Sequence, residues 1–343
     1  MKKHIAVVVS SHGEVDSPSF RAYYDNMKHI FAHVSEIMPI PKLARLLIPP
    51  IGAVIQARKS KTEGYISPMN RISARQAELI SEKLQQISSH DFQFSVFNTF
   101  ETTPPYTHDL LHHILHAEQD YDGVIALVMN PMESAFSCGA ICRFALKELG
   151  AKAYRRVRVV TGLYKHQALM NLYAEHIFSH VKPASEKSGL DKSGLIVALH
   201  GTVISDTKGN PVPFHNGLME NQTLFSCLKQ TLEQDSRNPF EQIEPAYLNH
   251  QVGGKWTEPT LAQTFSLFKK NGIEHAYLFA AGYFADNSET HGNAQSQLKK
   301  AGFKTAYYIP CINDSEAFAD LMAKEIVSAA ERLNARGKFL IDS

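Results

Sequence analysis

The sequence predicts an α/β fold with two domains, each a parallel β-sheet covered by helices. Seven short runs of consecutive apolar residues are present, and unbroken apolar character is typical of strands buried on both faces. Segments of helical length separate these runs, which is the alternation expected of parallel sheets. The chain has 343 residues, a length that suits two domains at about 150 residues each.

The predicted elements follow from these patterns. The strands are the most apolar short segments: Ile5–Val9, Phe92–Phe97, Gly123–Met129, Val157–Thr161, Leu195–Leu199, Ala276–Ala280 and Thr305–Ile309. The helices are longer and of mixed polarity: Ser73–Ile87, Tyr106–Glu118, Gly139–Leu149, Leu218–Asp235, Thr260–Asn271 and Ser315–Leu333.

The two expected domains begin with similar strands. I-A-V-V-V-S-S-H-G (5–13) resembles L-I-V-A-L-H-G (195–201), about 190 residues later. This repeat predicts a first domain over 1–164, joined by the C-terminal helix 315–335, and a second domain over 165–314. The polar segment 181–193 is the expected linker.

Composition and charge exclude several functional classes. With 44% hydrophobic residues, 20% charged residues and a net charge of +1, the chain is not expected to bind nucleic acid or to bind membranes through charge alone. The N-terminal apolar run is too short for a signal peptide, and no segment approaches the roughly 20 apolar residues of a membrane span. We therefore expect a cytoplasmic protein.

The four cysteines do not form a metal-binding pattern. No C-x-x-C pair occurs among Cys138, Cys142, Cys227 and Cys311. We expect reduced thiols and no iron–sulfur cluster.

Segment 37–61 combines four prolines, many large aliphatic residues and a basic end. Because prolines interrupt helices, it is expected to form short pieces. Two interpretations remain open. The residues alone favour a buried extended connection. The other interpretation is an apolar lip over a pocket that also touches a membrane, with Arg58, Lys59 and Lys61 near anionic headgroups.

Polar side chains follow three of the predicted strands. His12 and His200 each stand at a strand end before a glycine, and Asp286 and Glu289 follow the strand 276–280. In open α/β sheets ligands bind beyond such ends. One interpretation makes the two acids helix caps, with Asp286 or Ser288 as the capping residue. The other places Glu289 opposite His200 across a cleft, where the pair takes protons and binds a divalent cation.

The helix 106–118 carries histidines at intervals of four, namely His108, His112 and His116, with His113 beside them. This spacing places imidazoles on one face and allows a surface metal site. A solvated polar face is the favoured interpretation.

Five motifs in order along the chain resemble those of the ferrochelatase family, enzymes that insert ferrous iron into a porphyrin to make haem. The resemblance covers nearly the whole length. The motifs are G-Y-I-S-P-M-N-R-I-S-A-R-Q-A (64–77), V-A-L-H-G-T (197–202), Y-L-N-H-Q-V-G-G-K-W-T-E-P-T (247–260), G-Y-F-A-D-N-S-E-T (282–290) and I-P-C-I-N-D-S (309–315).

The resemblance implies two Rossmann-like domains with the active cleft between them. His200 and Glu289 would be both the catalytic and the metal-binding residues. It also favours the lip interpretation of 37–61. The implied porphyrin-binding residues are Tyr65, Ile66, Ser67, Met69, Tyr283 and Phe284. The implied accessory residues are His12, Asp286 and His291. The candidate partners of the porphyrin propionates are Arg45, Arg58 and Arg71. Ferrous iron and porphyrin would be substrates, and no cofactor would be required.

The sequence departs from the family pattern at several positions. The family's Asp-His becomes Asp286-Asn287, and acidic residues beyond the catalytic Glu become Asn293 and Gln297. Amides hold a divalent cation less well than carboxylates. The family's aromatic segment after the middle strand becomes N-P-M-E-S (130–134).

Three functions therefore remain open. The favoured one is a divergent ferrochelatase acting on protoporphyrin IX or coproporphyrin III. The others are a chelatase for another metal or tetrapyrrole, and a catalytically silent haem-binding protein. The expected partners are porphyrin and iron, without nucleic acid, with peripheral contact to the inner face of the membrane through the lip. A monomer or a homodimer is expected.

Overall fold

The chain folds into two compact units. A computed structural model describes residues 2–38, 40–87, 91–117, 120–181, 192–250 and 253–339, without the side chains of 336–339. Unit 1 comprises Met1–Met129, Ala135–Thr161 and Asp314–Ser343, and unit 2 comprises Asn130–Ser134 and Gly162–Asn313. The sequence had assigned 130–134 to the first domain. Most of the expected linker, 181–193, lies outside the described residues.

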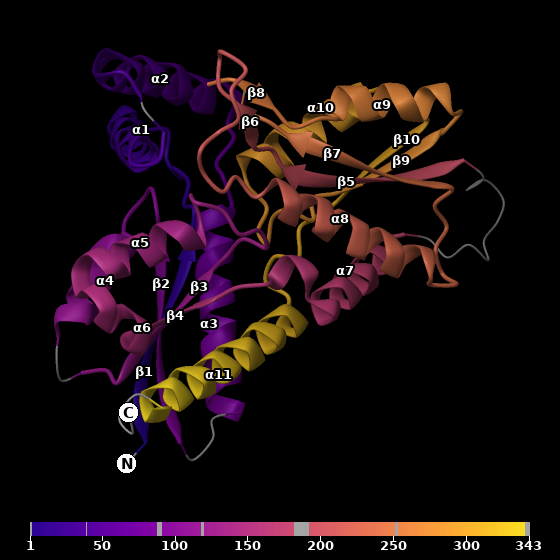
Figure 1. Ribbon diagram of the computed structural model, residues 1–343. Helices are drawn as coiled ribbons and strands as arrows, with labels where there is room; N and C mark the ends of the chain where they lie inside the picture. The colour runs from indigo at the N-terminus through magenta and orange to yellow at the C-terminus, as the bar shows by residue number, and fades with distance from the viewer. Residues whose placement is uncertain are drawn as a thin grey trace. The chain divides into compact units, whose positions relative to one another are not determined.

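Unit 1 contains a four-stranded parallel sheet with the order β2-β1-β3-β4. Its strands are β1 (Lys3–Ser11), β2 (Phe92–Phe100), β3 (Gly123–Val128) and β4 (Val157–Val160). Helices cover both faces (Figure 1), with α4 (Thr107–His116) and α5 (Cys138–Leu149) on one and α3 (Met69–Ile87) and α11 (Glu316–Phe339) on the other.

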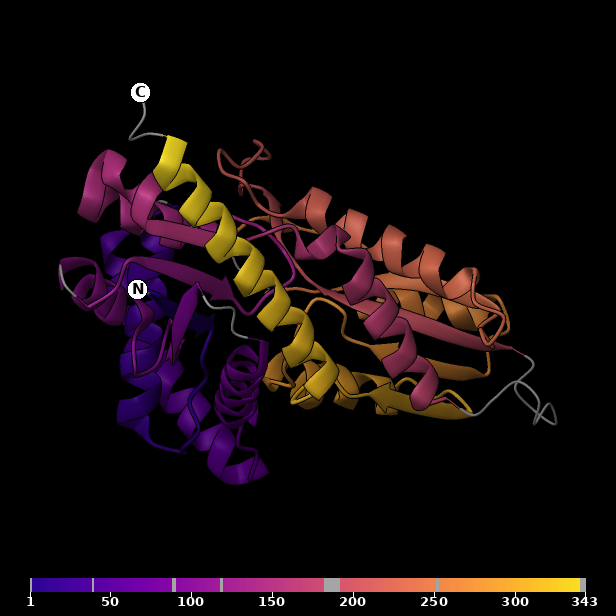
Figure 2. The ribbon, with the colours of Figure 1, turned by 90° about the horizontal axis from the view of Figure 1, so that it is seen from below.

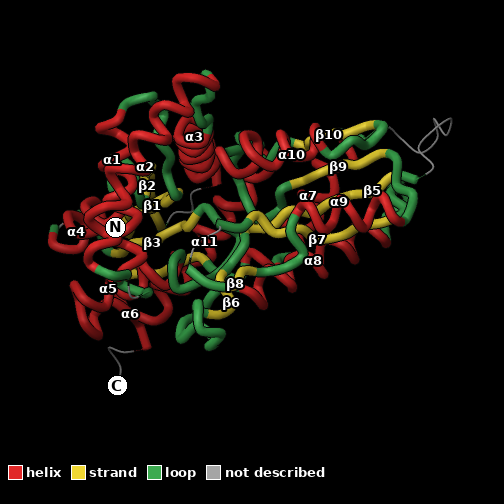
Figure 3. Tube along the Cα trace, turned by 90° about the horizontal axis from the view of Figure 1, so that it is seen from above, coloured by secondary structure: helices red, strands yellow, loops and turns green. Residues whose placement is uncertain are grey.

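Unit 2 contains a second four-stranded parallel sheet, with the order β10-β9-β5-β7. Its strands are β5 (Ser193–His200), β7 (Gln242–Leu248), β9 (His275–Phe279) and β10 (Thr305–Ile309), which run side by side in Figure 3. One face of this sheet packs on α9 (Leu261–Lys270) and α10 (Gln295–Lys300). The other face packs on α7 (Gln167–Ser179) and α8 (Leu218–Glu233), and these two helices lie next to each other in Figure 2.

The shorter elements complete the chain. They are α6 (Ala153–Arg156), the 3-10 turns η1 (Gly150–Lys152) and η2 (Leu163–Lys165), the π-helical turn η4 (Ser288–Ala294), and the short strands β6 (Val203–Ser205) and β8 (Lys255–Trp256), which pair with each other.

The two sheets have the same topology. Counted from the first strand of each unit, both orders read 2-1-3-4. β1 and β5 are therefore equivalent strands, and they are the two strands that the sequence repeat had matched. The predicted α/β class and all seven predicted strands are confirmed, whereas the expected cleft between the domains stays a prediction.

The sequence analysis missed strand β7. Its residues, Q-I-E-P-A-Y-L, include Pro245, which lacks the N–H that an inner strand needs. β7 lies at the edge of its sheet, where β5 is its strand partner and a single bridge joins Tyr247 to Thr260. An edge strand tolerates a proline, because the missing N–H can fall on the side without a neighbouring strand.

Segment 37–61 forms neither the short pieces nor the buried extended connection that the sequence predicted. Apart from Pro39, which lies outside the described residues, it leads into one helix, α2 (Lys42–Glu63), that contains Pro49 and Pro50. The prediction of short pieces is wrong, because the helix continues on both sides of Pro49 and Pro50 although an interior proline costs one hydrogen bond and crowds the preceding turn. α2 packs on α1 (Phe20–Ser35), where a Cβ on Gly52 would lie 2.6 Å from the sulfur of Met27.

The prediction of a buried connection is also wrong, because one side of α2 is exposed. Seven of its large aliphatic side chains are accessible to solvent: Leu43, Leu46, Leu47, Ile48, Ile51, Val54 and Ile55. Within the described residues, no helix combines the length and apolar character needed to cross a membrane.

Candidate active site

The strand order of unit 2 reverses between β5 and β9. From β5 the chain crosses to β7 on one side, and later to β9 and β10 on the other. In open parallel sheets, ligands bind beyond the carboxyl ends of the strands at such a reversal. His200 is the last residue of β5, and the loop with Tyr283 and Glu289 follows β9. The topology therefore brings these side chains to one place.

Two glycines allow the ends of these strands to approach closely. A Cβ on Gly282 would lie 2.7 Å from the backbone nitrogen of His200, and a Cβ on Gly201 would lie 2.6 Å from the carbonyl oxygen of Leu248. Neither position has room for a side chain. The backbones that carry His200, the segment after β7 and the loop after β9 consequently lie against one another.

Glu289 is held in the first turn of η4, whose cap is Asn287. The Asn287 side-chain oxygen accepts hydrogen bonds from the backbone nitrogens of Glu289 and Thr290, at 2.9 and 3.1 Å. The Thr290 hydroxyl in turn accepts from the Asn287 backbone nitrogen at 2.9 Å. Capping by Asp286 or Ser288, as the sequence suggested, is therefore wrong. π-Helical turns are frequent at functional sites.

Three potential metal ligands meet at this point. Nε2 of His250 lies 2.8 Å from Oε1 of Glu289, and the Tyr283 hydroxyl donates to Oε2. The ring of His200 lies 5.6 Å from that of His250 and 5.7 Å from that of Tyr283, centroid to centroid. One ligand atom each of His200, His250 and Glu289 lie within 4.8 Å of one another. The expected proximity of His200 and Glu289 is confirmed, while their catalytic role stays a prediction.

Glu289 is held as a carboxylate. Burial acts to raise its pKa, but the hydrogen bond from His250 opposes burial, and the neighbouring imidazoles of His200 and His250 and the Tyr283 hydroxyl act in the same direction as that bond. The net result is a pKa well below the ordinary value of 4.5. A group of this kind is a good cation ligand and a weak proton acceptor at neutral pH.

Asp286 stabilises the loop before Glu289. Its side chain is buried and accepts hydrogen bonds from the Tyr308 hydroxyl at 2.5 Å, the Cys311 backbone nitrogen at 3.1 Å and the Asn313 amide at 2.8 Å. Burial, together with Cys311 and Asp286, raises the pKa of Tyr308, so that the phenol remains a donor. Asp286 therefore connects the loop after β9 to the segment after β10 and lies outside the group of three ligands.

His250 was not identified from the sequence as a site residue. It lies in the motif 247–260, three residues beyond the start of that motif, and it follows the strand that the sequence analysis missed. A signal was nevertheless present, because the chain lacks the imidazole that the family pattern has at the position of Asn287, before Glu289. His250 supplies an imidazole to Glu289 from another strand.

The other accessory histidines do not join this group. His291 is exposed, and its ring lies 6.3 Å from that of Tyr308. His12 belongs to unit 1, where its Nδ1 lies 3.9 Å from the Glu101 carboxylate and its side chain is 53% exposed.

The expected porphyrin-binding residues divide between the two units, with Tyr65, Ile66, Ser67 and Met69 in unit 1 and Tyr283 and Phe284 in unit 2. Ile66 is exposed, whereas Met69 and Phe284 are buried. The Ser67 hydroxyl donates to the Glu14 carboxylate. Their contact with a porphyrin stays a prediction, and burial makes Phe284 a packing residue of its loop.

The residues beyond Glu289 are amides that bind each other. Nε2 of Gln297 donates to Oδ1 of Asn293 at 3.1 Å on the exposed side of η4 and α10. Positions 293 and 297 therefore provide amide groups rather than carboxylates, and amides are weaker ligands for a divalent cation.

Comparison with known proteins gives a consistent result. The model of the family described as Ferrochelatase matches residues 4–330. A protein named ferrochelatase from Neisseria gonorrhoeae is 23% identical over 335 residues, which cover 92% of this chain and 91% of the relative. A ferrochelatase from Helicobacter pylori is 24% identical over 240 residues, covering 67% and 66% of the two chains. One from Sodalis glossinidius is 31% identical over 101 residues, covering 28% and 30%.

Proposed function

The chain belongs to the ferrochelatase family of porphyrin metal chelatases, and we propose that it inserts ferrous iron into a porphyrin to give haem. The observation that carries the proposal is the meeting of His200, His250 and Glu289 at the strand reversal of unit 2. Two imidazoles and one carboxylate, with open positions remaining, are a donor set that suits Fe²⁺. Protoporphyrin IX and coproporphyrin III are both candidate substrates.

The three side chains have different tasks in this proposal. Glu289, whose pKa is held low, binds the incoming cation as a carboxylate. His200 and His250 complete the set of ligands. An imidazole nitrogen with a free lone pair can accept a proton, and we assign that task to His200 and His250 rather than to Glu289.

The proton balance follows from these tasks. A porphyrin loses two N–H protons as one Fe²⁺ enters, and the metal exchanges bonds to the protein for bonds to the pyrrole nitrogens. Each imidazole that releases the metal regains a free lone pair and can take one of the two protons. Two histidines beside one carboxylate thus match the two protons that must leave.

The exposed side of α2 supports a role for the lip. Its apolar side chains include Leu43, Leu46 and Ile51, and its C-terminal end carries Arg58 and Lys59. An apolar stripe beside cationic residues suits an interface with a membrane that contains anionic lipid. We propose that α2 contacts such a membrane peripherally.

One observation favours a second candidate, a haem-binding protein without turnover. The amide pair Asn293 and Gln297 occupies positions where the family often has carboxylates, and amides are weaker ligands for a divalent cation. This candidate predicts tight porphyrin or haem binding and no metal insertion.

Anaerobic metal insertion tests the proposal directly. The purified protein is mixed with Fe²⁺, or separately with Zn²⁺, and with protoporphyrin IX or coproporphyrin III, and the porphyrin spectrum is followed with time. We expect turnover with one of the porphyrins. His200→Ala removes a proposed proton acceptor and should lower turnover by about 10²- to 10⁴-fold. Glu289→Gln removes the carboxylate that binds the cation and should also lower turnover. Wild-type protein that binds porphyrin without turnover would contradict the chelatase proposal and support the haem-binding candidate.

A further inference from the structure

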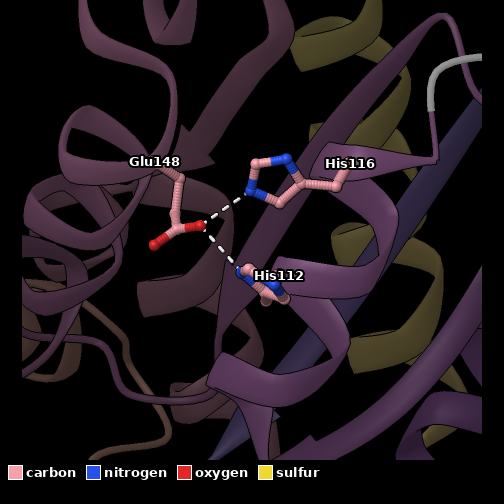
Figure 4. Close-up of side chains that lie close together, drawn as sticks. All are labelled: His112, His116 and Glu148. Atoms are coloured by element: carbon pink, nitrogen blue, oxygen red, sulfur yellow. Dashed lines mark hydrogen bonds and ion pairs between the residues drawn. The ribbon is translucent and has the colours of Figure 1, made fainter.

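A second group of potential metal ligands lies on the surface of unit 1. Figure 4 shows His112 and His116 on successive turns of α4, both directed at Glu148 near the end of α5. Nδ1 of His112 and Nε2 of His116 each lie 2.8 Å from Oε2 of Glu148. All three ligand atoms lie within 4.8 Å of one another.

The helices that carry these residues are fixed by the core. On α4, Leu111, Ile114 and Leu115 are buried against the sheet, and on α5 Ile141 is buried in the same apolar cluster. The backbone positions around the three side chains are therefore held before any ion binds. Helices are favourable places for a metal site, because they position its ligands more precisely than loops do.

The three side chains have the exposure that an accessible site needs. The histidine side chains are 62% and 51% exposed, whereas that of Glu148 is 16% exposed. Hydrogen bonds from His116 and then His112 lower the pKa of Glu148, so the oxygen that faces both rings belongs to a carboxylate at neutral pH.

The neighbouring histidines of α4 are separate from this group. His108 stacks on Phe144, with ring centroids 4.9 Å apart. His113 is exposed and is not part of the ligand group. The site thus consists of one pair of histidines at spacing four and a carboxylate from another helix.

We propose that His112, His116 and Glu148 bind a divalent transition-metal ion of the Zn²⁺ type. Zn²⁺ prefers imidazole and carboxylate ligands in tetrahedral sets, and three protein ligands leave one position for water. Two histidines four residues apart on a helix offer their nitrogens to the same ion, and the third ligand closes the set. The ion would join α4 to α5.

The site would couple metal concentration to the stability of unit 1. An ion that binds only the folded state raises the unfolding temperature by mass action. The site is distinct from the active-site residues of unit 2, so this proposal does not depend on the proposed catalytic function.

Calorimetric titration with Zn²⁺ alone, without porphyrin, tests the proposal. The full chain carrying His200→Ala is titrated so that the active-site ligands are disrupted, and the same background is then combined with His112→Ala, His116→Ala or Glu148→Gln. We expect the parent to bind Zn²⁺ and each added change to weaken binding by roughly tenfold or more. His113→Ala, a control on the same helix, should leave binding unchanged.

Thermal unfolding of the same proteins gives a second measurement. Zn²⁺ should raise the unfolding temperature of the parent and of the His113→Ala control, and should have a smaller effect on the three ligand variants. Equal Zn²⁺ affinity and equal thermal shifts in the parent and all three ligand variants would overturn the proposal. In an otherwise wild-type chain, His112→Ala should leave metal insertion unchanged, which separates failure of this site from failure of the active site.

Discussion

Nε2 of His250 lies 2.8 Å from Oε1 of Glu289, although the two residues follow different strands, β7 and β9. The family pattern has a histidine at the position of Asn287, so this chain lacks that imidazole before Glu289. The structure supplies one from β7 instead. His250 therefore places an imidazole against Glu289 in a chain that has none at position 287.

Replacing His250 by alanine should impair metal insertion. The change removes one ligand of the proposed set and the hydrogen bond that holds the Glu289 carboxylate. We expect kcat/KM for the metal to fall by about 10- to 100-fold while porphyrin affinity changes little. Steady-state insertion assays with varied Fe²⁺ measure the first quantity, and porphyrin fluorescence titration measures the second.

A matched control is available in the same unit. His215 lies 2.9 Å from the Glu220 carboxylate and its side chain is 56% exposed, so it resembles His250 without belonging to the ligand group. His215→Ala should keep wild-type turnover. Equal activity in wild type, His215→Ala and His250→Ala would show that His250 has no role in the reaction.

Replacing Tyr283 by phenylalanine should weaken metal insertion moderately. The ring remains, but Oε2 of Glu289 loses a donor. One hydrogen bond contributes about 1 kcal/mol, which corresponds to roughly fivefold in rate or affinity. The insertion rate of Tyr283→Phe compared with Tyr283→Ala measures this. If the two variants were equally active, the hydroxyl rather than the ring would account for the whole contribution of Tyr283.

Replacing Asp286 by alanine should destabilise unit 2. Three donors, from Tyr308, Cys311 and Asn313, lose a buried acceptor. Each unmet donor costs about 1–3 kcal/mol, so we expect a loss of about 3 kcal/mol or more in the free energy of unfolding. Urea unfolding followed by the fluorescence of Trp256, the single tryptophan of the chain, reports on this unit.

The control for Asp286 is the exposed acid Glu274. It forms surface ion pairs with Lys192 and Lys304, and such pairs contribute about 0–1 kcal/mol. Glu274→Gln should therefore change the unfolding free energy by less than Asp286→Ala. A similar effect of the two changes would contradict the role given to Asp286.

Replacing His108 by phenylalanine should reduce the acid sensitivity of unit 1. Burial, and then the charge of His33, lowers the pKa of His108 below its ordinary 6.5. The unfolded chain then binds the proton at a higher pH than the folded chain does. Stability is therefore present above about pH 6.5 and is lost as the pH falls toward the folded pKa.

The pH dependence of the unfolding temperature measures this effect. Between about pH 7 and pH 5 the His108→Phe curve should be flatter than that of wild type, because phenylalanine keeps the stacking on Phe144 without the titrating group. The exposed His113→Phe serves as the control. Parallel curves for wild type and His108→Phe would exclude this contribution.

Replacing Leu43 and Leu46 together by glutamate should abolish membrane contact through α2. Both side chains are exposed, at 65% and 70%, so the fold should tolerate the change. Co-sedimentation with phosphatidylserine-containing vesicles measures binding, with Met219→Glu, at 75% exposed in unit 2, as the control. Binding that is unaffected by the double change, or absent in wild type, would contradict the proposed contact.

Features that depend on local pattern could be predicted from the amino-acid sequence. Short apolar runs identified seven of the eight strands of the two sheets. The clearest runs belong to the inner strands β1, β3, β5 and β9, which are buried along almost their whole length and so need no polar residue between their ends. The repeat of a strand ending in His-Gly anticipated two sheets of one topology. The motifs around His200 and Glu289 indicated the family and the expected ligand pair.

Features that depend on contacts between distant residues became visible in the folded chain. Pro245 is compatible with β7 because that strand lies at a sheet edge, and the helix α2 is exposed although its composition suggested burial. His250 reaches Glu289 because Gly201 and Gly282 permit close approach of backbones. Glu148 meets His112 and His116 because two helices pack on one core. The physical reason is that hydrophobic periodicity reports only which side of an element is covered, whereas neighbours across elements are set by strand order and by packing.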